Sequence, residues 1–187
     1  MTGLARAETG NTGGRWRGYV GWGLLVLFVG IGLRPPGEWL TPDQAIYSLI
    51  GREVLQGAVP YRDLWDNKGP VMLFAYTGLA ALFGAHQLWY DLFFLTVWTG
   101  WCVWAAYLLG STLGGALAGR WAALLLLFAT SFPLAREFNA EMVALPFVLM
   151  AVNLLLIGMR NGSPWRLVGA GVGLAIAVWT KPVYCFD

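Results

Sequence analysis

Residues 40–70 read LTPDQAIYSLIGREVLQGAVPYRDLWDNKGP, a polar stretch in a chain that is otherwise mostly apolar. It carries seven charged side chains: Asp43, Arg52, Glu53, Arg62, Asp63, Asp66 and Lys68. Apolar runs come before it and after it. An unsatisfied charge in hydrocarbon costs several kcal/mol, so a polar segment between membrane helices must lie in water or line a wet cavity. We therefore interpret residues 40–70 as the active loop of a membrane enzyme.

The composition predicts an all-α, polytopic membrane protein. Of the 187 residues, 58% are hydrophobic and 12% are charged, whereas soluble domains average about 45–50% apolar and about 25% charged residues. The net charge of +2 gives no indication of nucleic-acid binding. Cys102 and Cys185 belong to no CxxC or Cys/His cluster, so we predict neither a disulfide framework nor a metal site on them.

Apolar runs predict about five transmembrane helices, since a span needs about 20 apolar residues. They cover residues 19–33, 92–109, 117–134, 142–159 and 167–186. Residues 1–18 contain three arginines and no lysine, which favours a cytoplasmic amino-terminal tail. A cleaved signal peptide is the alternative for the first run, but no A-x-A site follows it. Residues 19–187 are then one transmembrane domain, and we expect it to be the amino-terminal part of a longer protein.

Residues 71–84 form an apolar run of about 14 residues, which is short for a span and typical of an interfacial helix. If this run crosses the membrane, the arginine-containing connector 110–120 is outside and the acidic loop 135–141 is inside. If it lies in the interface, the arginine-containing connectors 110–120 and 160–166 are both cytoplasmic, and the acidic loops 34–91 and 135–141 share the outer face. We prefer the interfacial arrangement because Lys and Arg favour the cytoplasmic side. Residues 42–56 predict a second short amphipathic helix on the membrane surface, with Ile46, Leu49, Ile50 and Val54 on one apolar face.

Two carboxylates are the candidate catalytic residues, Asp43 and Glu141. Asp43 lies in the first turn of a predicted helix, and Glu141 lies in a short loop just before an apolar run. Ordinary helix-start and loop carboxylates are the alternative for both positions. On one membrane face and lining one cavity, they could hold a divalent cation (Mg²⁺ or Mn²⁺) or divide into a general base and a positioning group.

Three cations at the ends of apolar runs are candidates for binding a phosphate: Lys68, Arg136 and Lys181. Basic side chains at the headgroup level suit a phosphate ligand. The alternative is that they extend to the interface as ordinary helix-end residues, which is common.

Three tracts resemble the membrane glycosyltransferases of the GT-C fold. They are PYRDLWDNKGP at 60–70, FNAEMVALP at 138–146 and GVGLAIAVWTKP at 171–182. The closest likeness is to the family-39-type enzymes, which include protein O-mannosyltransferases, the aminoarabinose transferase of lipid A and lipopolysaccharide-core transferases. The resemblance covers residues 16–187 in order and in spacing. This chain departs from it at Gln44, where many relatives have a second acid, and at Gly69, where many have a second proline.

The resemblance implies transfer of a sugar from a polyprenyl-phosphate donor to a glycan, lipid or protein hydroxyl at the extracytoplasmic face of a bacterial inner membrane. It implies catalytic roles for Asp43 and Glu141. It also implies that the residues of the 60–70 tract and two other cations bind substrate: Tyr61, Arg62, Asp63, Asp66, Lys68, Arg136 and Lys181. The relatives are several hundred residues long, so activity of these 187 residues alone is not implied.

A transporter or channel subunit is the competing interpretation, and a non-catalytic membrane scaffold is a third. A transporter predicts charges within the spans or broken helices near the midplane. Here the apolar runs are almost free of charge and the polar residues gather at their ends. We therefore favour the glycosyltransferase.

Overall fold

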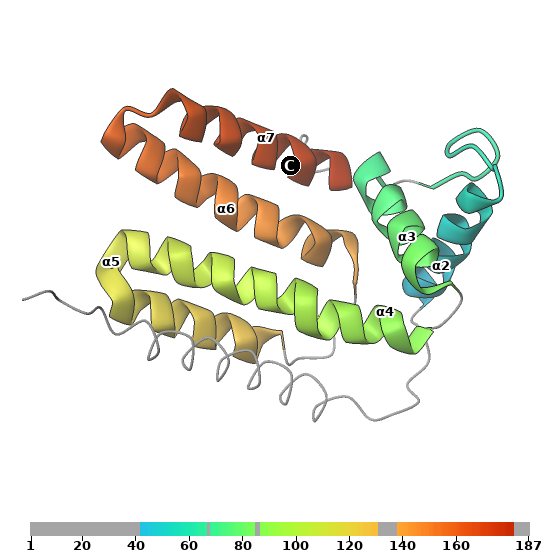
Figure 1. The fold of residues 1–187 in the computed structure, drawn as a ribbon, viewed down its shortest axis with the longest axis horizontal. Coiled ribbons are helices and arrows are strands. Elements are labelled where there is room, and N and C mark those ends of the chain that lie inside the picture. Colours follow the sequence, from blue (N-terminus) through green and yellow to red (C-terminus); the bar gives the residue numbers. More distant parts are fainter. Residues whose placement is uncertain (1–41, 67, 85–86, 131–137, 182–187) are drawn as a thin grey trace, which may run out of the picture.

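The computed structural model describes residues 42–66, 68–84, 87–130 and 138–181 of the chain. Every regular element among them is a helix (Figure 1). In chain order these are α2 (Pro42–Leu55), α3 (Pro70–Phe83), α4 (Gln87–Phe93), the π-helical segment η1 (Phe94–Trp98), α5 (Thr99–Ala129), α6 (Ala140–Asn161) and α7 (Pro164–Thr180). The predicted first span, 19–33, lies outside the described residues.

Two described stretches are long and apolar enough to cross a membrane, Trp89–Ala129 and Ala140–Asn161. This conclusion rests on their length and composition. The described part of the chain is therefore all-α, as predicted, and compatible with a membrane protein. The apolar run at 71–84 forms the 14-residue helix α3.

The predicted connector 110–120 contains the chain reversal, but it is not an extended loop, because helix continues through most of it. Only Gly114 and Gly115 leave helical geometry, and Gly115 adopts a positive φ of 78° that favours glycine. The two arms of α5 therefore run antiparallel (Figure 1). They approach so closely that a Cβ on Gly110 would lie 2.9 Å from the Cα of Gly119. The small residues that looked like a loop in the sequence instead let two helices touch.

The turn between α6 and α7 lies at the same end as the α5 reversal. The guanidinium of Arg160, at the end of α6, donates a hydrogen bond of 2.9 Å to the carbonyl of Thr112 in α5. Close contact between α6 and α7 depends on glycine, since a Cβ on Gly173 would lie 3.2 Å from the Phe147 carbonyl. The two arginine-containing segments thus share one end of the bundle.

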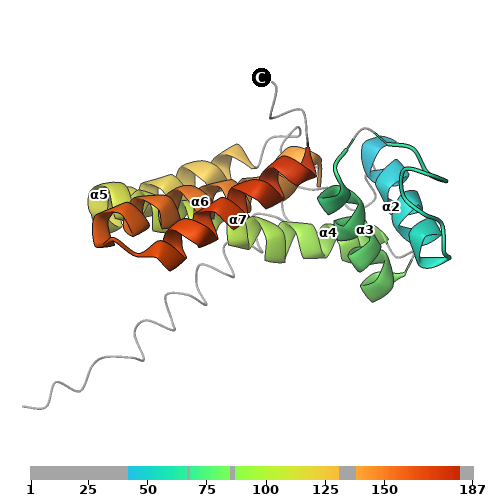
Figure 2. The same cartoon turned by 90° about the horizontal axis from the view of Figure 1, so that it is seen from above.

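The α2–α3 pair lies at the opposite end, beyond the carboxyl end of α7 (Figures 1 and 2). Tyr47 and Ile50 of α2 are buried with α3 residues, and a Cβ on Gly51 would lie 2.6 Å from the Tyr76 carbonyl oxygen. Of the predicted apolar face of α2, Ile50 is buried against α3, whereas Ile46 and Leu49 are half exposed. The buried face is rotated toward Tyr47 and Gly51, where the small glycine admits the backbone of α3.

Candidate functional site

Glu141 lies in the first turn of α6, where the sequence builds a well-formed helix start. Asn139 is the N-cap, and its side chain accepts a hydrogen bond of 2.9 Å from the Met142 amide. The exposed Glu141 carboxylate forms an ion pair with Lys181, with 2.5 Å between Nζ and Oε1. Lys181 follows the last residue of α7, so this pair joins the ends of two long helices.

Asp43 lies in the first turn of α2 and is exposed. One helical turn later, Tyr47 is only 3% exposed. Burial raises the pKa of the Tyr47 phenol, and the negative charges of Asp66, Asp43 and Glu141 raise it further. Three carboxylates from three separate segments therefore act on one phenol, which stays neutral and can donate a hydrogen bond.

The backbone of Lys68 is held on both sides by its own loop. Asp66 Oδ1 accepts a hydrogen bond of 2.7 Å from the Lys68 amide, and the Tyr61 hydroxyl donates one of 2.7 Å to the Lys68 carbonyl. The Lys68 charge in turn attracts the Glu141 carboxylate. We call the set Asp43, Tyr47, Asp66, Lys68, Glu141 and Lys181 the polar cluster.

Arg62 and Asp63 are paired with each other on the exposed loop. Arg62 donates two hydrogen bonds of 2.8 Å to the Asp63 carboxylate, which lower the pKa of that carboxyl. Asp63 also accepts a hydrogen bond from the Val59 amide, which lowers this pKa as well. The loop contains Tyr61 with a positive φ of 64°, a rare conformation for a bulky residue. These contacts fix the conformation of the loop. Tyr61 is connected to the polar cluster by its hydrogen bond to the Lys68 carbonyl.

Two further residues were predicted to bind substrate, Arg136 and Lys181. Arg136 lies outside the described residues. Lys181 is engaged with Glu141, which points to a role in holding that carboxylate. Tyr47 was not predicted, although its place four residues after Asp43 puts both on neighbouring turns of one helix.

The predicted divalent cation finds little support in the ligand set. Across residues 42–66, 68–84, 87–130 and 138–181, no group of three or more His, Cys, Asp or Glu side chains could hold a metal ion. One oxygen of Glu141 is already taken by the Lys181 ammonium. These residues fit an ion-paired carboxylate better than a metal site, so we derive no catalytic step through a metal.

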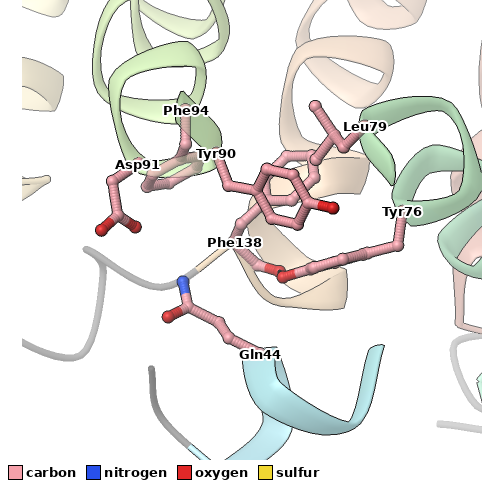
Figure 3. Close-up of a pocket in the computed structure, with 7 residues that line it drawn as sticks. All are labelled: Gln44, Tyr76, Leu79, Tyr90, Asp91, Phe94 and Phe138. Carbon is pink, nitrogen blue, oxygen red and sulfur yellow. The ribbon is translucent and has the colours of Figure 1, made fainter. Parts of the chain in front are cut away.

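A small cavity lies between α2, α3 and the start of the α4–α5 helix (Figure 3). Its lining consists of Gln44, Tyr76, Leu79, Tyr90, Asp91, Phe94 and Phe138. It has room for about one water molecule and cannot hold a sugar. Asp43 and Glu141 do not line this cavity, although Gln44 directly follows Asp43. This cavity is therefore not the predicted one, which both acids would line.

Comparisons with family models, curated proteins and solved structures find no match.

Proposed function

We propose that this chain is part of a GT-C-type membrane glycosyltransferase that uses a polyprenyl-phosphate-linked sugar. The observation that carries the proposal is the polar cluster, which gathers acids and lysines from α2, the 56–69 loop, α6 and α7 at one end of an apolar helical bundle. The three tracts that resemble the family-39-type enzymes contribute most of these residues. The two lines of support therefore meet on the same side chains.

In the proposed reaction, the acceptor hydroxyl attacks the anomeric carbon of the donor sugar. The bond between that carbon and the phosphate oxygen breaks, and the phosphate leaves with the bonding electrons. Asp43 accepts the hydroxyl proton as general base, a role worth about 10²–10⁴-fold in rate. It suits this role because its carboxylate is exposed and can approach a substrate.

Lys68 is the proposed partner of the leaving phosphate, because a fixed positive charge stabilises the negative charge that develops there. Tyr61 and Asp66 hold its backbone in place. Lys181 neutralises and orients Glu141 within the same cluster. We propose that Glu141 supports the site as a positioned charge, with Tyr47 as a neutral hydrogen-bond donor beside it.

The topology belongs to the same proposal. The end of the bundle that carries the polar cluster faces the extracytoplasmic side, with α2 and α3 at the membrane interface. The arginine-containing turns and the amino-terminal tail face the cytoplasm. Five spans, one of them at 19–33, complete this part of the protein.

The test is the substitution Asp43→Asn in the full-length protein, assayed in membranes for sugar transfer from a polyprenyl-phosphate donor. Asn can still accept a hydrogen bond at the helix start, so the fold should survive. We expect transfer to fall by about 10²–10⁴-fold. Glu53→Gln, on the same helix, is the matched control and should retain transfer. Wild-type turnover by Asp43→Asn at matched expression would remove Asp43 from the site.

A further inference from the structure

A proline inside α6 leaves one buried carbonyl without its helical donor. In an α-helix the amide of residue 146 would donate to the carbonyl of residue 142. Pro146 has no N–H, and its ring crowds that carbonyl. Met142 is only 6% exposed, so water cannot readily replace the missing donor. A buried carbonyl of this kind needs a partner from elsewhere.

Trp98 supplies that partner. Its indole Nε1–H donates a hydrogen bond of 2.8 Å to the Met142 carbonyl, across 44 residues of chain. Trp98 is the last residue of η1. A π-helical turn carries an extra residue, and such turns are frequent at functional sites. The indole N–H thus occupies the role that the amide of residue 146 would have in a regular helix.

The other side of Glu141 is held in a similar way. The Tyr76 hydroxyl donates a hydrogen bond of 2.9 Å to the Phe138 carbonyl. The rings of Trp98 and Phe138 also meet edge to face, with centroids 5.3 Å apart. Glu141 therefore lies between two carbonyls, at 138 and 142, that are each bound by an aromatic side chain from another helix.

We propose that Trp98 and Pro146 form a matched pair that sets the direction of the first turn of α6 and so positions Glu141 against Lys181. Trp98 is a positioning residue, because it contacts the backbone of Met142 and no reacting atom. The importance of this placement for catalysis rests on the proposed function, whereas the placement itself does not. The pair explains why a proline is accommodated within the second turn of a 22-residue helix.

The proposal makes a specific prediction of rescue. Trp98→Phe removes the donor while keeping an aromatic ring, so the Met142 carbonyl loses its partner. Pro146→Ala restores a backbone N–H that can form the regular helical bond. The double variant should therefore recover what the single Trp98→Phe variant loses. A tryptophan that only filled space would show no such dependence on residue 146.

The measurement is cross-linking between Glu141→Cys and Lys181→Cys with a short bis-maleimide, in a background in which Cys102 and Cys185 are alanine. A second pair, Gly158→Cys with Leu167→Cys, reports on the opposite end of α6 and α7, where the Cβ of 158 would lie 3.2 Å from Leu167 Cγ. We expect Trp98→Phe to lower the 141–181 yield by about fivefold or more. The 158–167 yield should stay unchanged, and adding Pro146→Ala should restore the 141–181 yield.

Three results would overturn the proposal: an unchanged 141–181 yield in Trp98→Phe, an equal fall for both cysteine pairs, or no recovery on adding Pro146→Ala. If Trp98→Phe does not fold, recovery of folding in the Trp98→Phe/Pro146→Ala variant supports the pair, and failure of both variants to fold overturns it.

Activity is a separate readout, in the full-length protein with its native cysteines. If the wild type transfers sugar, Trp98→Phe should lower kcat with little change in the KM for the donor, and Pro146→Ala should restore kcat. A wild type without transfer would refute the proposed function and leave the cross-linking result standing. An active wild type with no cross-linking response would refute the positioning pair alone.

Discussion

Gly69 offers a sharp test of how the polar loop is fixed to the bundle. Its amide donates a hydrogen bond of 3.0 Å to the Thr180 carbonyl at the end of α7. A Cβ at this position would lie 1.7 Å from the Trp179 carbonyl oxygen and 2.5 Å from its carbon. Real Cβ atoms almost never come within 3.0 Å of a heavy atom from another part of the structure. Gly69→Ala must therefore push the loop and α7 apart.

The magnitude follows from two terms. Forcing an extra methyl group into a filled site costs about 1–3 kcal/mol. Losing the hydrogen bond to Thr180 adds about 0.5–1.5 kcal/mol, so we expect a loss of about 2–4 kcal/mol in the free energy of unfolding. Backbone strain adds little, because Gly69 has a φ of −74° that alanine readily adopts. The cost is therefore steric and specific to this contact.

The assay is thermal unfolding in detergent, followed by tryptophan fluorescence. Gly78→Ala is the matched control, since Gly78 lies in α3 and a methyl group added there would meet nothing within 4 Å. There alanine should stabilise the helix by about 0.5–1 kcal/mol. A Gly69→Ala variant that unfolds at the same temperature as the wild type or as Gly78→Ala would refute the contact.

Two further predictions concern the Tyr76 hydroxyl and the Asp63 carboxylate. Tyr76→Phe leaves the buried Phe138 carbonyl without its donor, so the free energy of unfolding should fall by about 1–3 kcal/mol. Tyr107→Phe is the control and should have a much smaller effect. Equal stability of the two variants would count against this bond. The pKa of Asp63 is lowered in the folded loop, so its contribution to loop order is present above the unfolded pKa and is lost as the pH falls through the folded value. Pepsin cleavage of the wild type within residues 56–68 should therefore accelerate below about pH 4. Above that pH, Asp63→Asn should be cleaved faster than the wild type, and its cleavage rate should depend less on pH. A variant with the same rate-against-pH profile as the wild type would refute the role of Asp63.

The helices with clear apolar patterns could be predicted from the sequence. The short helix α3 and the helix starting at Pro42 were placed to within about a residue or two, which is the ordinary uncertainty of helix ends. The α5 reversal was predicted in place, as a connector at 110–120, but its tight form was not predicted. Its glycines suggested a loop, while in the structure Gly110 and Gly119 bring two helices into contact and only Gly114 and Gly115 turn the chain.

The candidate site could be predicted only in part, because some of its residues stand out in the sequence and others do not. Charged residues in an apolar chain are conspicuous, so Asp43, Lys68 and Glu141 were selected as candidates from composition and position. Tyr47 and Trp98 were not, because their roles depend on contacts between distant segments. A buried phenol near three carboxylates and an indole bound to a carbonyl 44 residues away leave no local pattern in the sequence.

The proposed site requires Asp43 and Glu141 to face one compartment, and their sidedness can be measured. Single cysteines at 43, 141 and 161 can be labelled in intact cells with a membrane-impermeant maleimide, in a background in which Cys102 and Cys185 are alanine. Asn161, at the far end of α6, is exposed and serves as the opposite-side control. If the polar cluster faces the extracytoplasmic side, positions 43 and 141 label from outside and position 161 labels only after permeabilisation. Labelling of 43 and 141 from opposite sides would contradict the proposed site.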